Sequence, residues 1–317
     1  MTEPSPPINP ESTIVGWIGT GVMGGAMCGH LLRAGYRVVV YSRTAARARP
    51  LLAAGAVWTD SVAGVAASAD VVCTMVGLPR DVEEVILGPD GVLEHARPGA
   101  LVIDFTTSSP ALAVRLAAAA TERGIAVLDA PVSGGDLGAR EARLSAMIGG
   151  DASAVERARP LLSVFCKTIA HLGGAGAGQH TKVVNQLVIA STMIGVCEGL
   201  LYGFSAGLPI DEVLRVVGAG AARCFSLDSY APRILRGDYE PGFFVEHFVK
   251  DLEIALAEAD RLGLKLPGAE LAQRLYRALV ESGRGRKGSQ ALLLALAELA
   301  GPEVLARLPT GERPQQG

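Results

Sequence analysis

Lys182 and Asn185 are the two residues whose types and spacing best suit acid–base chemistry in this chain. The chain has five lysines against twenty-four arginines, so a lysine here is informative. Arginine keeps its proton near neutral pH, whereas a desolvated lysine can release it. Residues three apart share one face of a helix, which would place a proton carrier beside an amide that orients a substrate. A lysine near a helix start is ordinary by itself, so this interpretation depends on further motifs.

A glycine-rich turn follows the first apolar run. Residues 14–18 predict a short buried strand, and a helical pattern and a second strand at 36–41 follow the turn. This order is the one that a dinucleotide site needs, because its glycines allow a tight turn, the approach of a pyrophosphate and close helix packing. The helix N-terminus would favour the anion. The turn reads Gly19-Thr20-Gly21-Val22-Met23-Gly24.

The end of the second strand bears on the choice of dinucleotide. A site for NAD needs an acidic residue there for the ribose diol. No acidic residue occurs between Gly19 and Trp58, and the strand is followed by Ser42-Arg43-Thr44. Arg43 suits a 2′-phosphate through charge-assisted hydrogen bonds. We therefore expect NADP(H) to be preferred over NAD(H); the alternative is that Arg43 is a solvated loop cation.

Three further strand ends carry residues that could contact ligands. Ligands in such sheets bind outside the carboxyl ends of the strands. Ser133, Gly134 and Gly135 follow one such strand and could form a nest for a carboxylate, although an ordinary glycine-rich turn reads the same way. The strand ends at 75–79 and 104–108 could line the nicotinamide and its ribose.

Composition excludes several classes of protein. A formal net charge of −3 over 317 residues gives no electrostatic attraction to nucleic acid. Five scattered cysteines without a Cys-x-x-Cys pair indicate a reducing compartment, and we expect a cytoplasmic protein. The histidines are isolated, so no metal site is predicted. The apolar stretch 183–208 contains Asn185, Gln186, Ser191, Thr192 and Glu198, which favours a buried helix over a membrane span, and the N-terminus shows no signal pattern.

Strand-like and helical patterns alternate as far as residue 173, and only helical patterns follow. Alternation predicts a mostly parallel sheet covered on both faces. We expect an α/β, doubly wound Rossmann-type domain at 12–176 and an all-α domain at 177–308, joined by a long helix. The tails at 1–11 and 309–317 are predicted to be flexible.

Three glycines spaced four apart lie inside the predicted long helix, namely Gly195, Gly199 and Gly203, and Gly207 marks its end. Glycine inside a helix costs about 1 kcal/mol relative to alanine. We therefore expect another helix to cross this face closely, from the same subunit or from a second one. A homodimer or homotetramer is expected.

Together these motifs resemble those of the β-hydroxyacid dehydrogenase family, which includes 3-hydroxyisobutyrate dehydrogenase and tartronate semialdehyde reductase. The matching segments are Gly19 to Gly24, Asp129 to Gly135, Gly178 to Gln186, and Lys250-Asp251-Leu252. The resemblance implies that Lys182 is the catalytic lysine and Asn185 the substrate-orienting asparagine. It also implies a carboxylate site at Ser133, Gly134 and Gly135, and cofactor contacts at Leu78, Pro79, Thr107 and Lys250.

The activity implied by the resemblance is reversible hydride transfer between NADP(H) and a small 3-hydroxy acid, with its 3-oxo acid or semialdehyde as the other partner. Lys182 would act as general acid/base. Many members carry Asp-x-Ser-Ala-Leu where this chain has residues 288–292, Gly-Ser-Gln-Ala-Leu, which leaves the substrate open. Alternatives are an imine reductase, which usually lacks the lysine, and a non-catalytic NADPH-binding scaffold.

Overall fold

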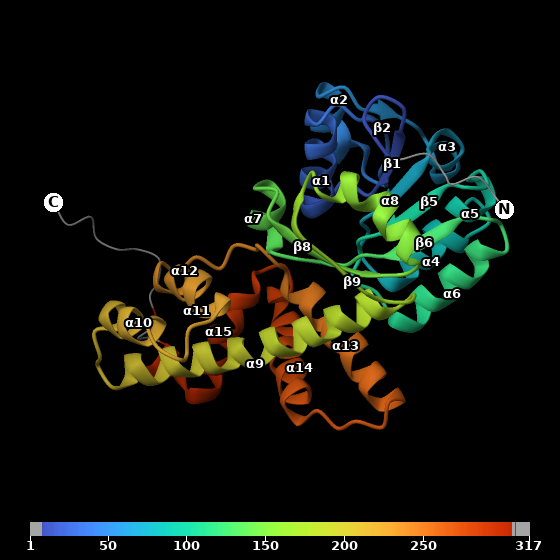
Figure 1. Ribbon diagram of the computed structural model, residues 1–317. Helices are drawn as coiled ribbons and strands as arrows, with labels where there is room; N and C mark the ends of the chain where they lie inside the picture. The colour runs from blue at the N-terminus through green and yellow to red at the C-terminus, as the bar shows by residue number, and fades with distance from the viewer. Residues whose placement is uncertain (1–7, 306–307, 309–317) are drawn as a thin grey trace. The chain divides into compact units, whose positions relative to one another are not determined.

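The protein is described by a computed structural model that covers residues 8–305 and 308 (Figure 1). The chain divides into two compact units, Met1–Lys182 and Val183–Gly317, called unit 1 and unit 2 below. The sequence prediction placed the division between 176 and 177, where the long helix begins. Of the tails predicted to be flexible, only residues 8–11 are described, and Ile8 there is buried in the core of unit 1.

Unit 1 is built on a nine-stranded sheet in the order β3-β2-β1-β4-β5-β6-β8-β7, with β9 paired to β8. Strands β1 to β6 run parallel, and β8 is antiparallel to β6 and β7. This is the strand order of a doubly wound dinucleotide-binding fold, as the sequence predicted. The strands are β1 (Ile14–Ile18), β2 (Arg37–Tyr41), β3 (Val57–Trp58), β4 (Val71–Thr74), β5 (Leu101–Asp104), β6 (Ala126–Asp129), β7 (Val132–Ser133), β8 (Leu144–Gly149) and β9 (Cys166–Gly173).

Both faces of this sheet are buried. Successive side chains of a strand point to opposite faces, and in β4 Val71 and Cys73 belong to one hydrophobic cluster while Val72 belongs to another. Two-sided burial explains why the strands read as continuous apolar runs. The covering helices are α1 (Val22–Arg33), α2 (Arg49–Ala53), α3 (Val62–Ser68), α4 (Pro79–Leu87), α5 (Val92–His95), α6 (Pro110–Thr121), α7 (Gly135–Arg140) and α8 (Ala152–Leu162).

Unit 2 is helical. Among its described residues, the only β-type pairing is an isolated antiparallel bridge between Phe244 and Gly288. Its largest buried side chains, Phe248 and Tyr276, stack edge to face with ring centroids 4.8 Å apart. The long helix α9 starts in unit 1 and continues into unit 2. The α-helices are α9 (Ala177–Ser205), α10 (Ile210–Gly218), α11 (Phe225–Ser229), α12 (Ala231–Leu235), α13 (Val245–Arg261), α14 (Pro267–Leu279), α15 (Leu292–Ala300) and α16 (Pro302–Leu305).

By length and composition α9 could cross a membrane. One face of the helix, however, contributes Met193, Cys197 and Leu200 to the hydrophobic core of unit 2. Packing against the other helices therefore accounts for the apolar residues on this face. Its opposite face exposes Val188 and Tyr202.

The glycines of α9 differ in what surrounds them. A side-chain carbon at Gly203 would come within 2.6 Å of Ile210, so a close approach exists there. Side-chain carbons at Gly195 and Gly199 would meet nothing within 4 Å in the described part of the chain. Within the described part of this subunit a close neighbour is therefore found only at Gly203, where it is the side chain of Ile210 at the start of α10, and the predicted helix crossing stays a prediction.

Candidate active site

The glycine turn after β1 has the geometry that an anion needs. Gly19 has a φ of +97°, and a side chain there would overlap the carbonyl of Met75. A side chain at Gly24 would overlap the Gly19 carbonyl, whereas the space beside Gly21 is open. Helix α1 begins after Gly21, with no capping side chain and no acidic residue in its first turn. The N–H groups at this helix start therefore suit a diphosphate.

Thr20 supplies a second reason to place an anion at this turn. Its hydroxyl is buried and makes no hydrogen bond to any described residue. Buried polar atoms in proteins nearly always have a partner. A ligand phosphate oxygen at the turn would provide one, so the residues present fit a dinucleotide.

Arg43 lies just beyond β2 and is paired with an acidic residue that the sequence analysis did not consider. One Arg43 guanidinium nitrogen is 3.2 Å from Oδ1 of Asp81, and the Arg43 side chain is 77% exposed. Asp81 Oδ2 accepts a hydrogen bond of 3.0 Å from the Leu78 backbone N–H, which caps α4. No acidic residue follows β2 closely in the sequence, but folding brings the Asp81 carboxylate of α4 beside the end of this strand. Asp81 is largely buried, but the guanidinium of Arg43 is exposed and therefore accessible to a phosphate.

A buried hydrogen-bond network holds the loops after β4 and β5. Asp104 Oδ1 accepts hydrogen bonds from the Thr74 hydroxyl at 2.7 Å and from the Thr106 backbone N–H at 3.1 Å. The Thr106 hydroxyl in turn accepts from the Val76 backbone N–H at 3.0 Å. Burial raises the pKa of Asp104 to about 6. The network joins the two loops that contain the predicted cofactor contacts Leu78, Pro79 and Thr107.

Asp129, at the end of β6, anchors the start of α9. Its Oδ1 accepts from the Gly176 backbone N–H and its Oδ2 from that of Gln179, both at 2.8 Å. A side chain at Gly178 would overlap the Asp129 and Met147 carbonyl oxygens, so this helix start fits only with glycine. The carboxylate satisfies N–H groups that a helix start leaves unpaired, and its charge is favoured there. Burial raises the pKa of Asp129 as well.

Gln179 connects the same helix to the loop after β5. Its side chain is 1% exposed; Oε1 accepts from the Ser108 backbone N–H at 2.9 Å, and Nε2 donates to the Thr106 carbonyl at 2.7 Å. Lys182 is three residues further along α9 and therefore shares this face of the helix. Its side chain is 7% exposed. Asp129 and Gln179 thus position the lysine-bearing turn at the carboxyl ends of β5 and β6.

Ser133, Gly134 and Gly135 lie where β7 gives way to α7. Gly134 has a φ of +128° and Gly135 of +63°, a region that favours glycine. Ser133 is the register partner of Ser145 on β8. Two consecutive glycines in such conformations suit a concave row of N–H groups, and the carboxylate nest remains a prediction.

Unit 2 contains the other two residues singled out from the sequence, Asn185 and Lys250. Asn185 Nδ2 donates to Gln186 Oε1 at 2.7 Å, and Gln186 Nε2 donates to Asp251 Oδ2 at 2.6 Å. Lys250 Nζ is 2.9 Å from Asp251 Oδ1. Gln186 and Asp251 are both 2% exposed. Sequence reasoning quoted these two residues only as parts of motifs and missed that they connect Asn185 to Lys250.

The structure thus places the predicted site residues in two groups. Unit 2 holds Asn185 and Lys250, which this chain of hydrogen bonds and one ion pair connects. Unit 1 holds the rest, either at the carboxyl ends of strands or on the helix starts that follow them. These are Gly19, Thr20, Gly21, Val22, Met23, Gly24, Ser42, Arg43, Thr44, Leu78, Pro79, Thr107, Ser133, Gly134, Gly135 and Lys182.

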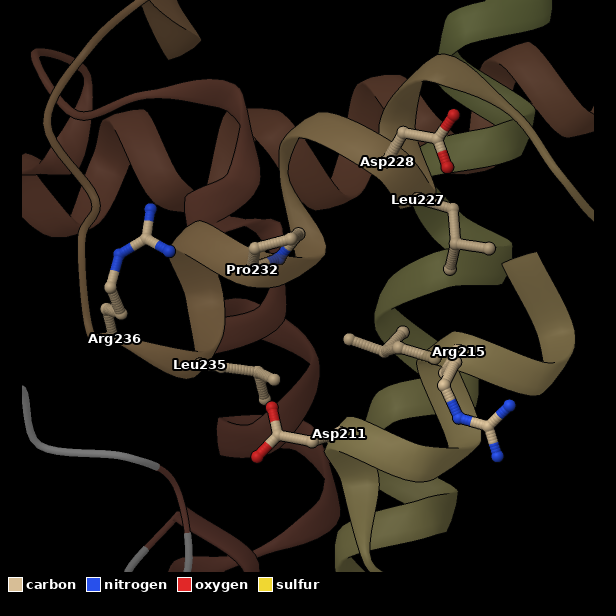
Figure 2. Close-up of a pocket in the computed structure, with 8 residues that line it drawn as sticks. Asp211, Arg215, Leu227, Asp228, Pro232, Leu235 and Arg236 are labelled. Atoms are coloured by element: carbon tan, nitrogen blue, oxygen red, sulfur yellow. The ribbon is translucent and has the colours of Figure 1, made fainter. Parts of the chain in front are cut away.

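A separate cavity of about 440 Å³ lies among α10, α11 and α12 in unit 2 (Figure 2). No predicted site residue lines it. Two of its four charged side chains form ion pairs, because Arg215 lies 2.7 Å from Glu212 and Asp228 lies 3.1 Å from Arg223. The lining holds two acidic and two basic side chains, so their formal charges balance.

Two family models together cover most of the chain. Residues 14–173 match the model described as the NAD binding domain of 6-phosphogluconate dehydrogenase. Residues 176–296 match the model described as NAD-binding of NADP-dependent 3-hydroxyisobutyrate dehydrogenase.

Individual relatives are similar over nearly their whole length. The chain is 50% identical over 293 residues to probable 3-hydroxyisobutyrate dehydrogenase-like 1, mitochondrial, of Arabidopsis thaliana, covering 92% of this chain and 87% of that protein. It is 36% identical over 286 residues to 2-hydroxy-3-oxopropionate reductase of Escherichia coli, covering 90% and 98%. Among solved structures, it is similar to Mycobacterium tuberculosis 3-hydroxyisobutyrate dehydrogenase with L-serine, with a TM-score of 0.82, 32% identity, and coverage of 90% of this chain and 99% of that one.

Proposed function

Because the chain belongs to the β-hydroxyacid dehydrogenase family, and is thus an NAD(P)-dependent oxidoreductase acting on CH–OH groups, we propose that it uses NADP(H) to interconvert a small 3-hydroxy acid and its 3-oxo acid or semialdehyde. One observation carries this proposal for the present chain. Asp129 and Gln179 fix the start of α9 against the ends of β5 and β6, where such folds bind ligands, and Lys182 is on the next turn.

The cofactor would be held by the glycine turn and the strand ends of unit 1. The diphosphate would lie at Gly21 and the start of α1, with the Thr20 hydroxyl as a further partner. Arg43 would bind the 2′-phosphate. The matching family models name both NAD and NADP, so the preference for NADP(H) rests on Arg43. When bound, the nicotinamide would supply or accept the hydride.

The protein's own residues would orient the substrate and move one proton. Ser133 and the amides of Gly134 and Gly135 would hold the carboxylate, which fixes the reacting carbon relative to the cofactor. Lys182 Nζ would take the hydroxyl proton in oxidation and return it in reduction. The amine must be neutral before it accepts the proton, and burial disfavours the charged form of an amine. Asn185, one helical turn away, would hold the substrate oxygen.

A substrate panel tests this function. Reduction of NADP⁺ would be followed with a series of small 3-hydroxy acids, and oxidation of NADPH with semialdehydes and cyclic imines. We expect turnover with at least one 3-hydroxy acid and with the matching carbonyl compound. Turnover of imines alone would contradict the proposal and favour an imine reductase, and NADPH binding without turnover of any compound would favour a scaffold.

A further inference from the structure

Two hydrogen bonds in unit 2 connect Asn185 to the buried carboxylate of Asp251, and an ion pair connects that carboxylate to Lys250. Asn185 donates to Gln186, Gln186 donates to Asp251, and Lys250 Nζ lies at the second oxygen of Asp251. The three distances are 2.7, 2.6 and 2.9 Å. Gln186 and Asp251 are on α9 and α13, 65 residues apart in the chain.

The carboxylate determines the direction of the whole chain of hydrogen bonds. An amide side chain can be turned either way, but an ionised carboxylate can only accept. Asp251 Oδ2 faces Gln186, while Oδ1 lies 2.9 Å from the Lys250 ammonium as an ion pair without hydrogen-bond geometry. Gln186 must therefore present its NH₂ group to Asp251 and its oxygen to Asn185. Asn185 must then present its own NH₂ group to Gln186. Only one of the two orientations of each amide gives every contact a donor and an acceptor.

We propose that Asp251, acting through Gln186, fixes which end of the Asn185 amide faces the substrate. Asp251 and Gln186 are positioning residues in this account, and neither contacts the reacting atoms. The inference rests on the proposed function, in which Asn185 holds the substrate oxygen. Reversing the amide would exchange a donor for an acceptor at that oxygen, so one fixed orientation favours turnover.

Asp251→Asn tests the direction of these hydrogen bonds, because an asparagine side chain has nearly the same shape as an aspartate. An asparagine there offers one oxygen to two donors, Lys250 and Gln186. The charged ammonium makes the stronger hydrogen bond and is expected to take that oxygen. The NH₂ group of the introduced asparagine then faces Gln186, which must turn over, and Asn185 must turn over with it.

A second substitution should restore the original direction. In the double variant Gln186→Glu with Asp251→Asn, residue 186 is the acceptor-only group. It can accept from the new amide at 251 on one side and from Asn185 on the other, so Asn185 returns to its first orientation. Gln186→Glu alone puts two carboxylates together, which is unfavourable while both are ionised.

Steady-state kinetics on the full-length protein would show this pattern. We expect each single variant to lower kcat about 10- to 100-fold, the scale of a misplaced reacting group, and the double variant to recover most of it. Asp260→Asn, at an exposed ion pair on the same helix, is the matched control and should keep kcat. If kcat of the double variant falls by the product of the two single-variant losses, the proposal is overturned. A loss confined to the NADPH Kd would also overturn it, because Asp251 would then act through Lys250.

The orientation of Asn185 can be followed without turnover, because the chain has only two asparagines, Asn9 and Asn185. Protein labelled with ¹⁵N-asparagine should show a side-chain amide signal that disappears in Asn185→Ala. Asp251→Asn adds a third labelled asparagine, so the Asn185 signal is assigned in each background by adding Asn185→Ala. We expect the Asn185 signal to shift in Asp251→Asn and to return in the double variant. A signal that Asp251→Asn leaves unmoved would overturn the inference.

These readouts also separate failure of the inference from failure of the proposed function. A wild-type protein without turnover, but with the expected amide shifts, would contradict only the proposed function. Should Asp251→Asn fail to fold, recovery of folding and of the amide signal in the double variant supports the inference. A double variant that recovers neither contradicts it.

Discussion

Asp104 and Asp129 are direct register partners at the carboxyl ends of β5 and β6, and both carboxylates are buried. Each has a separate role in the architecture of the site. Asp104 joins the loops after β4 and β5, and Asp129 holds the start of the helix that carries Lys182. Two buried carboxylates side by side make this edge of the sheet sensitive to pH.

The pKa of Asp104 leads to a prediction about stability. Burial raises this pKa to about 6 from its ordinary value of 3.8. Between these values the folded state binds more protons than the unfolded state, so this group's contribution to stability falls as pH rises from about 4 to about 6. The raised pKa of Asp129 acts in the same direction.

Asp104→Asn should therefore stabilise the protein at neutral pH. Both hydrogen bonds go to Oδ1, which the amide oxygen can replace, while the buried charge is lost. We expect a gain in the free energy of unfolding of at most about 3 kcal/mol at pH 8, and little or none at pH 4. The measurement is denaturant unfolding of variant and wild type at both pH values. Equal destabilisation at the two pH values would show that the charge is not the controlling feature.

Asp129→Ala should affect both stability and turnover. It leaves the backbone N–H groups of Gly176 and Gln179 without their acceptor, at a cost of about 1–3 kcal/mol for each buried group that stays unpaired. Because α9 carries Lys182, kcat should fall as well. Asp151→Ala is the control, since Asp151 caps α8 in the same way, through the backbone N–H groups of Ser153 and Ala154, which are not predicted site residues. Equal kcat in the two variants would contradict the role given to Asp129.

Arg43→Ala tests the cofactor preference. Loss of charge-assisted hydrogen bonds to a 2′-phosphate should raise the KM for NADP(H) about 10- to 100-fold and change the KM for NAD(H) little. Arg47→Ala, four residues along, is the control. The measurement is kcat/KM with both cofactors for each protein. A wild-type enzyme that prefers NAD(H) would contradict the NADP(H) proposal directly.

Gly199→Leu tests the proposed homo-oligomer. No described atom lies within 4 Å of a side-chain carbon at this position, so a single subunit has room for it. We expect a second subunit to pack there, and the variant should form smaller species in sedimentation experiments. An unchanged assembly together with a higher Tm would show that Gly199 faces only solvent. Replacing a solvent-exposed helical glycine by leucine stabilises the helix by under about 1 kcal/mol, which would raise the Tm.

The parts of the fold predicted from the sequence are those with local signals. The turn at 19–24 and the strands at 14–18 and 36–41 were identified because each has its signal in consecutive residues. The two-residue strands β3 and β7 are too short to show a pattern. Strand β9 was missed because its burial is irregular.

The site residues that the sequence did not predict share one property: each contacts a residue that is far away along the chain. Asp81 meets Arg43 across 38 residues, and Asp251 meets Gln186 across 65. No local pattern records such pairings; they follow only from the packing of whole elements. A polar residue inside a recognised motif that has no assigned role, such as Gln186 after Asn185, is a signal that could have found them.

The most direct test of the account is the turnover of Lys182→Met, a substitution that keeps length and removes the amine. With the 3-hydroxy acid that the panel identifies, kcat should fall about 10²- to 10⁴-fold, while the Kd for NADPH stays near that of the wild type. Near-normal kcat in this variant would contradict the role of Lys182 as the acid–base group, and with it the central claim.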